Sequence, residues 1–239
     1  MIDGILLVDK PSGWTSFDVV AKVRGILRAD MRAKIELSEQ SNGQKKVKVG
    51  HTGTLDPLAT GLLVLVLGNY CKRAQEFSKL DKIYEVTIKL GQTSTTGDEE
   101  GEKQQICEDV PTKEQVTAVL SQFKGDIMQT PPAYSAIKIN GQRAYKLARE
   151  GKDVTIEPRP VHINDITDIT YKYPGIKFTA EVSSGTYIRS LATDIGNQLE
   201  TGAYMSDLRR TRVGTFDIAQ AISLTDIDMQ IVSNNVFMV

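Results

Sequence analysis

The chain has 239 residues, of which 40% are apolar and 25% are charged, and its formal net charge is −1. This composition is typical of a globular protein with one sizeable core, either as one large domain or as a domain with a lobe. The longest apolar runs, residues 5–8 and 62–67, are too short to span a bilayer, and the first four residues lack the basic start of a secretory signal. We therefore expect a cytoplasmic protein without membrane contact.

The first elements of the chain are a buried strand, a helix and a loop. Residues 4–8, GILLV, predict a short buried strand. Thr15 and Asp18 have the spacing of a capping box, which predicts that a helix begins here, and its apolar stripe continues to about Ala29. Residues 30–48 are polar, basic and aperiodic with Ser-Asn-Gly at their centre, which favours a surface loop or insertion.

The rest of the chain mixes strands and helices without a regular alternation. A capping box at residues 112–115 predicts a helix to about Phe123, residues 142–150 predict a short helix stopped by Gly151, and residues 185–187 open a helix through Leu199. The expected strands lie at residues 84–90, 134–139 (followed by a turn at 140–141), 161–169, 177–182 and 207–216. This pattern predicts an α+β fold with a mixed, largely antiparallel sheet.

Positive charge is concentrated in three segments, although the total charge is close to zero. Residues 22–48 hold eight Lys or Arg against three acids, residues 131–160 hold six against three, and residues 208–212 contain three arginines. Acid gathers at residues 98–102 and after Phe216. A charge run is usually a solvated face, but local basic patches are what a polyanion meets, so RNA is a candidate partner.

Residues 50–61, GHTGTLDPLATG, place one ionisable acid, Asp56, among small turn-forming residues directly before the apolar run 62–67. An isolated Leu-Asp-Pro is an ordinary structural turn, but here the carboxylate would be displayed on a tight loop feeding a buried strand. The sequence has no dinucleotide, P-loop, zinc-protease or nucleophile-elbow motif, and its two histidines, His51 and His162, cannot build a histidine-rich metal site. We expect neither cofactor nor metal.

Six segments, in the same order, resemble the TruB family of tRNA pseudouridine synthases. The resemblance extends over nearly all of residues 2–225, and it implies the pseudouridine synthase fold with a thumb-like insertion. It also implies isomerisation of uridine 55 in the T-loop of tRNA. The segments are 10–16 (KPSGWTS), 50–61, 82–86 (KIYEV), 131–136 (PPAYSA), 185–191 (GTYIRSL) and 208–214 (LRRTRVG).

The resemblance implies three catalytic residues. Asp56 corresponds to the nucleophile, Tyr84 to the ring that stacks on the target uracil and acts as general base, and Arg189 to the ion-pair partner of Asp56. A carboxylate acts at C1′ of the ribose only while it is ionised, and a nearby arginine would keep it so. From the residues alone, a core aromatic on an alternating strand is the preferred interpretation of Tyr84. Arg189 lies in the first turns of a helix, where a cation gains nothing from the helix dipole.

The resemblance also implies the residues that bind the substrate. Lys10 would support the active-site loop, His51 would fill the gap left when the target base flips out, and Leu208 would line the uracil pocket. Without the resemblance, these three could be a turn lysine, a loop hydrogen-bonder and a core leucine. The remaining expected RNA contacts are Tyr187 and the thumb residues Lys138, Arg143, Lys146 and Arg149, which would fold over the T-loop.

We expect one catalytic domain at residues 1–225, with the thumb at about 127–160, followed by a short acidic tail at 226–239 in place of the PUA domain of many family members. The expected partner is the T-stem-loop of tRNA, bound by a monomer without an obligatory protein partner. Two alternatives stay open: a guide-RNA-dependent synthase of the dyskerin type, which normally needs a PUA domain and partner proteins, and a non-catalytic tRNA-binding or folding chaperone.

Overall fold

The computed structural model describes residues 2–38, 46–135, 137–139, 141–150, 155–225 and 227–239. The chain forms two compact units, one of Met1–Lys82 with Arg209–Val239 (unit 1) and one of Ile83–Leu208 (unit 2). Strand β12 (Ala203–Val213) contributes residues to both. Among the described residues, no helix combines the length and the hydropathy that crossing a membrane would require.

Unit 1 is built around the antiparallel pair β1 (Gly4–Lys10) and β3 (Thr60–Leu67). The short strand β14 (Ile222–Ser223) runs parallel to β1, and β2 (Val49–His51) pairs antiparallel with β3. At the start of β3, Thr60 and Gly61 pair in parallel with Arg209 and Arg210 of β12. The remaining elements are η1 (Gly68–Arg73), α2 (Ala74–Ser78), β13 (Phe216–Asp217), η2 (Ile218–Gln220) and α6 (Met229–Asn235).

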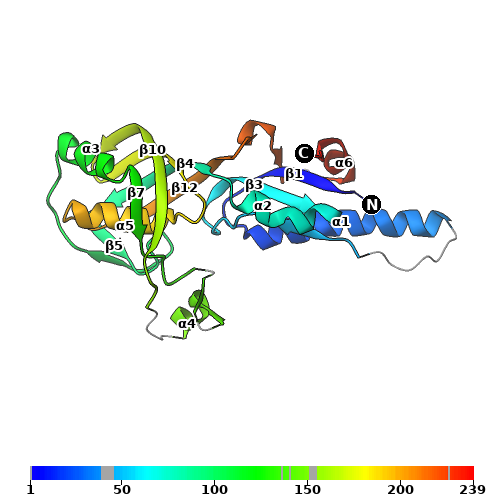
Figure 1. Ribbon diagram of the computed structural model, residues 1–239, viewed down its shortest axis with the longest axis horizontal. Helices are drawn as coiled ribbons and strands as arrows, with labels where there is room; N and C mark the ends of the chain where they lie inside the picture. Colours follow the sequence, from blue (N-terminus) through cyan, green and yellow to red (C-terminus); the bar gives the residue numbers. More distant parts are fainter. Residues whose placement is uncertain (1, 39–45, 136, 140, 151–154, 226) are drawn as a thin grey trace. The chain divides into compact units, whose positions relative to one another are not determined.

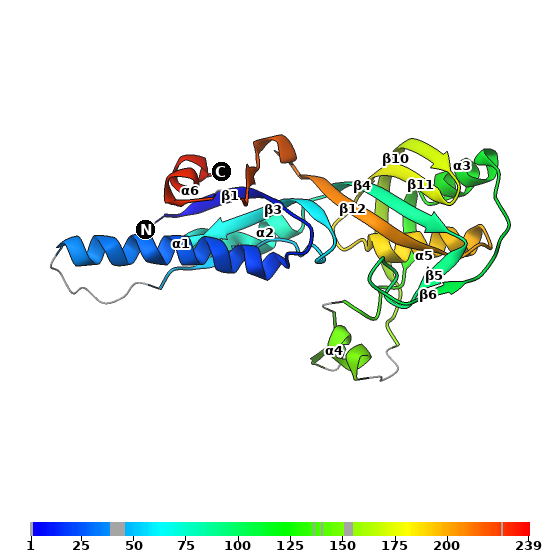
Figure 2. The same ribbon diagram turned by 180° about the vertical axis from the view of Figure 1, so that it is seen from behind.

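Both faces of β3 are buried, which explains why its sequence is an uninterrupted apolar run. Leu63, Leu65 and Leu67 pack in one hydrophobic cluster with the apolar stripe of the long helix α1 (Ser16–Ser38), which runs along β1 and β3 (Figure 2). The alternate residues of β3 face a second cluster that contains Phe77. The predicted capping box is confirmed, because the Thr15 amide donates to Asp18 Oδ2 over 2.9 Å and the Asp18 amide donates to Thr15 Oγ1 over 3.1 Å.

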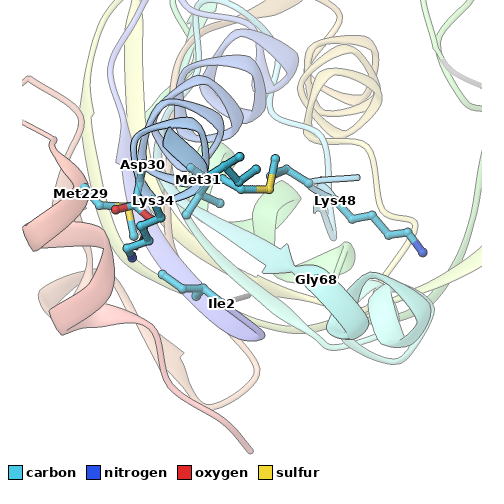
Figure 3. A pocket seen from close by; sticks show the side chains of 10 residues that line it. Ile2, Asp30, Met31, Lys34, Lys48, Gly68 and Met229 are labelled. Carbon is cyan, nitrogen blue, oxygen red and sulfur yellow. Dashed lines mark hydrogen bonds and ion pairs between the residues drawn. The ribbon is translucent and has the colours of Figure 1, made fainter. Parts of the chain in front are cut away.

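The prediction that this helix ends near Ala29 and gives way to a loop is wrong, because α1 continues to Ser38. Met31 and Ile35 follow Leu27 at helical spacing and line an apolar pocket of about 330 Å³ (Figure 3). An ion pair of 2.8 Å between Asp30 and Lys34 adds local support. Residues 39–45 of the expected loop lie outside the described residues. The pocket is completed by Ile2, Val47, Lys48, Gly68 and Met229.

Residues 227–239, expected only as a short acidic tail, pack onto unit 1. Val232 of α6 is fully buried in the cluster under α1. Phe237 forms an antiparallel bridge with Ile5, donating to and accepting from its backbone over 3.1 and 2.8 Å. The tail is therefore part of the core of unit 1.

In unit 2 the strand order is β12–β4–β11–β10–β7, and β10 pairs antiparallel with both β11 and β7 (Figure 1). The bounds are β4 (Lys82–Leu90), β7 (Gly125–Gln129), β10 (Arg159–Lys172) and β11 (Gly175–Val182), with the small hairpins β5 (Gln92–Ser94)–β6 (Lys103–Gln105) and β8 (Lys138–Ile139)–β9 (Gln142–Arg143). The helices are α3 (Lys113–Gln122), α4 (Ala144–Arg149) and α5 (Ile188–Gln198). The predicted α+β fold with a mixed, largely antiparallel sheet is confirmed.

The expected strand at residues 134–139 is wrong over most of its length, because only Lys138–Ile139 pair as a strand. The carbonyls before them serve tertiary contacts, since Tyr134 O accepts from Arg189 and Ser135 O accepts from the Tyr145 amide. Ala136, Asn140 and residues 151–154, including the expected stop at Gly151, lie outside the described residues. The last predicted strand, 207–216, starts earlier and is broken at Gly214, where φ is +54°.

Candidate active site

Asp56 lies on the loop between β2 and β3, and the backbone on both sides of it is fixed. The Ser16 hydroxyl, which is buried at the start of α1, donates to Leu55 O over 3.0 Å and accepts from Leu55 N over 2.8 Å. On the other side, the Gly13 amide donates to Pro57 O over 2.9 Å. Residues of segment 10–16 therefore hold the loop by hydrogen bonds to Leu55 and Pro57. Asp56 lies between these two residues and is half-buried.

Lys10 is completely buried beneath this loop. Its ammonium donates to three carbonyl oxygens: Trp14 O over 2.7 Å, Pro11 O over 2.9 Å and Pro57 O over 3.2 Å. The last of these belongs to the residue that follows Asp56. The structure thus places Lys10 in contact with this loop, and its role in supporting an active site stays a prediction.

Arg210 closes the base of the same loop, and its side chain is 2% exposed. Its Nε donates to Leu62 O over 2.8 Å and its Nη2 donates to Gly53 O over 3.0 Å, so one guanidinium joins the two ends of the segment that carries Asp56. Gly61 lies so close that a Cβ there would stand 2.2 Å from Arg210 O. This role was missed, because Arg210 was counted with the basic residues of 208–212; period-two alternation with Leu208 could have indicated its burial.

The cationic groups below the loop influence one another. Burial lowers the pKa of Lys10 to about 8; the Asp56 carboxylate opposes this shift and Arg210 adds to it. Burial, with a smaller contribution from Arg210, also lowers the pKa of His51. His51 ends β2, and its Nδ1 is buried without a hydrogen-bond partner among the described residues. This shift favours the neutral form of the imidazole. The insertion of His51 into RNA stays a prediction.

In unit 2, Arg189 is the second residue of α5 and is 7% exposed. Its guanidinium donates to Tyr134 O over 2.9 Å and to Thr96 O over 3.2 Å. It also forms an ion pair with Asp98, in which Nη1 and Oδ2 are 3.5 Å apart. Arg189 gains nothing from the dipole of α5, and its position in the first turn is explained by its ion pair with Asp98, a buried acid 91 residues earlier in the chain.

Asp98 is itself 3% exposed and is held by its own loop. Its Oδ1 accepts from the Thr96 hydroxyl and, over 3.1 Å, from the Glu100 amide. The sequence analysis did not identify Asp98 as a site residue. It begins the acidic run 98–102, which was interpreted only as balancing the positive charge of the basic segments. The expected pair of Arg189 with Asp56 joins residues of the two units and stays a prediction.

Tyr84 and Leu208 lie on β4 and β12, which are neighbours in the sheet, and both side chains are buried. Tyr187 caps α5, and the buried amide of Gln129 fixes it by accepting from Tyr187 N over 2.8 Å and donating to Tyr187 O over 3.1 Å. The uracil-binding roles of these residues stay predictions. Among the described residues, no group of three or more His, Cys, Asp or Glu side chains is placed to hold a metal ion.

The expected thumb contains the β8–β9 hairpin and α4. Lys138 and Arg143 are register partners across the hairpin, and Arg143 and Lys146 are exposed. The side chains of Lys138 and Arg149 lie outside the part of the chain that the structure describes. The contact of these four residues with RNA stays a prediction.

Models of known families match most of the chain. Residues 41–188 match the TruB family pseudouridylate synthase N-terminal domain, and residues 189–236 match the tRNA pseudouridylate synthase B C-terminal domain. Among solved structures, a crystal structure of a Cbf5–Nop10–Gar1 complex is 30% identical with a TM-score of 0.68, covering 93% of this chain and 53% of that one. An H/ACA RNP bound to a substrate RNA containing 2′-deoxyuridine is 28% identical with a TM-score of 0.65, covering 93% and 51%. The chain spans about half the length of these proteins.

Curated relatives match over almost the whole chain. The tRNA pseudouridine synthase B of Stutzerimonas stutzeri is 43% identical over 227 residues, which are 95% of this chain and 69% of that protein. The protein of the same name from Clostridium acetobutylicum is 40% identical over 235 residues, covering 98% of this chain and 75% of that protein. Together with the family models, this similarity shows that the chain belongs to the TruB family of pseudouridine synthases.

Proposed function

We propose that this protein converts uridine 55 in the T-loop of tRNA to pseudouridine, with Asp56 as the nucleophile. The observation that carries the proposal is the fixed geometry of the Asp56 loop, whose backbone is anchored by Ser16 and Gly13 and underpinned by Lys10. A nucleophile must be held in position to gain the rate advantage of an intramolecular reaction. The relatives named tRNA pseudouridine synthase B support tRNA as the substrate class.

The reaction needs no redox change and loses no group. The C1′–N1 glycosidic bond breaks as the Asp56 carboxylate attacks C1′, the uracil turns within the site, and C5 then bonds to C1′ as the carboxylate leaves. Removal of the C5 proton restores the conjugated uracil ring, and N1 gains a proton. Tyr84 is the base that removes the C5 proton, and its phenol ring is the surface on which the uracil stacks.

Asp56 acts only as an anion, and two cations favour that state. Lys10 lies under the loop and lowers the energy of the ionised carboxylate. Arg189 is already oriented by Asp98 and two carbonyls in unit 2, and pairing with Asp56 is its role in catalysis. Asp98 is then a positioning residue that acts through Arg189.

The target uridine is stacked inside a folded RNA loop and must be extruded before Asp56 reaches C1′. The neutral ring of His51, at the start of the Asp56 loop, takes the place of the flipped base. Leu208 lines the uracil pocket. Tyr187 and the thumb cations Lys138, Arg143, Lys146 and Arg149 hold the T-loop of a tRNA bound by a monomer.

The test is incubation of purified protein with an unmodified tRNA transcript, followed by mapping of pseudouridine at single-nucleotide resolution. We expect one pseudouridine, at position 55, formed without added RNA or protein. A transcript with cytidine at position 55 is the matched control and should stay unmodified. Turnover only after addition of a guide RNA and partner proteins would support the dyskerin-type alternative, and tight binding without turnover would support the chaperone.

A further inference from the structure

The continuation of α1 to Ser38 brings Arg32, which was expected in a loop, into line with three side chains of the expected helix. Phe17, Arg24, Arg28 and Arg32 are spaced by seven, four and four residues and therefore share one helical face. At 1.5 Å per residue, the arginines succeed one another about every 6 Å and the whole row is about 22 Å long. We call these four residues the α1 strip.

Phe17 gives the strip an aromatic end beside the catalytic loop. The ring is 63% exposed, although it lies in the first turn of a helix whose apolar stripe is buried. Its chain neighbour Ser16 bonds to Leu55, the residue before Asp56. The ring thus lies within one residue of an anchor of the Asp56 loop.

Arg24 connects the strip to the other end of this loop. Its guanidinium carbon is 5.8 Å from the centre of the Phe17 ring, and its Nη2 donates to Val49 O of β2 over 3.0 Å. β2 ends at His51, the residue expected to insert into the RNA. Phe17 is thus connected through Arg24 to the strand that leads into the Asp56 loop, and through Ser16 to the residue before Asp56.

The strip is bordered by an apolar pocket and by a neutral ion pair. Asp30 and Lys34 neutralise each other (Figure 3). Met31 and Ile35 follow Arg24 and Arg28 by seven residues, so the apolar pocket that they line borders the strip. Arg28 and Arg32 are exposed. The strip thus presents positive charge next to an exposed aromatic ring, the combination that binds nucleic acid by phosphate contacts and base stacking.

We propose that the α1 strip is an RNA-docking surface for nucleotides that flank the target uridine. The Phe17 ring stacks on an unpaired base, and Arg28 and Arg32 contact successive backbone phosphates. The proposal rests on the proposed function, because that function places an RNA loop at Asp56. It also gives a role to three of the eight basic residues of segment 22–48, which the Asp56 chemistry does not use.

The first test measures the affinity for an unmodified T-stem-loop RNA as a function of salt, in the Asp56→Asn background so that no turnover occurs. Arg28→Gln with Arg32→Gln should weaken binding and make the slope of log K against log salt less steep by roughly 0.7–0.9 for each lost phosphate contact. The matched control is Lys72→Gln with Lys79→Gln, which removes two exposed charges of unit 1 outside the strip. Equal salt slopes for the two double variants would overturn the proposal.

The second test addresses stacking. Phe17→Ala should weaken binding on the order of tenfold, whereas Phe17→Tyr, which keeps an aromatic ring, should bind as the parent does. In RNAs with 2-aminopurine at single T-loop positions, quenching at one position should disappear with Phe17→Ala and return with Phe17→Tyr. Parent-like affinity and quenching for Phe17→Ala would refute the stacking role. Wild-type turnover is measured in parallel, so a failure of the strip is distinguishable from a failure of the proposed function.

Discussion

Replacement of Asp98 by Asn tests the positioning of Arg189. The amide retains an oxygen that can accept from Thr96 and Glu100, so the loop around residue 98 keeps its hydrogen bonds. What it loses is the negative charge 3.5 Å from the Arg189 guanidinium. Arg189 then stays buried and keeps the carbonyls of Thr96 and Tyr134 as acceptors.

The magnitude follows from the burial of the pair. Both side chains are almost inaccessible to water, so screening is weak and the attraction lost with the Asp98 charge is large. Loss of one partner of a buried pair costs about 3–5 kcal/mol, and we expect the lower end because the geometry of the loop is retained. If the guanidinium shifts by about 1 Å, the catalytic rate should fall by roughly 100-fold.

The assay combines urea unfolding with single-turnover formation of pseudouridine on a T-stem-loop RNA, at a temperature where every variant is folded. Asp126→Asn is the charge-matched control, since this acid of unit 2 is exposed and pairs with His162. We expect a cost of about 0–1 kcal/mol and no loss of rate for the control. A folded Asp98→Asn variant with the wild-type rate would refute the positioning of Arg189 by Asp98.

Three further predictions concern other groups of the site. Tyr84→Phe keeps the stacking ring and loses the hydroxyl, so RNA affinity should persist while the single-turnover rate collapses; a wild-type rate would leave Tyr84 as a stacking platform only. Arg189→Lys keeps the charge without the planar fork and should be badly impaired in turnover, whereas full activity would show that charge alone suffices. The pKa of Lys10 is about 8 when folded and about 10.5 when unfolded, so the unfolded chain binds more protons between these values and stability should rise with pH in that window. The slope contributed is at most about 1.4 kcal/mol per pH unit, and Lys10→Met should remove it from urea unfolding curves measured between pH 7 and 10.5; an unchanged slope would contradict the burial of the charge.

Local signals in the sequence predicted the elements well where side chain and backbone interact within a few residues. The capping boxes at Thr15 and Thr112 both form, and the alternation of β4 follows its burial. The predicted end of α1 is wrong because residues 30–38 are mostly polar, whereas Met31 and Ile35 continue the helical spacing of Leu27. A composition-based loop prediction misses such a stripe when it is only two residues long.

The candidate site residues were identified from family motifs, and their roles stay predictions. Asp56 and Lys10 stand in motifs, and the structure brings Lys10 to the Asp56 loop. The partners of Arg189 and the clamp made by Arg210 were not predictable, because both depend on tertiary pairing between distant segments. A charged residue in a run of like charges is interpreted as a surface residue when only the sequence is considered, and its burial is seen only in the fold.

In the proposed mechanism, Asp56 is the nucleophile of a tRNA uridine-55 isomerisation. The most direct measurement is single-turnover conversion of unmodified tRNA by wild type and by Asp56→Asn, with the affinity of each protein for the same tRNA measured alongside. Because the amide has nearly the same shape but is neither an anion nor a nucleophile, we predict that the variant binds tRNA with wild-type affinity and forms no pseudouridine at position 55. Formation of pseudouridine by Asp56→Asn at a rate near that of wild type would contradict the account.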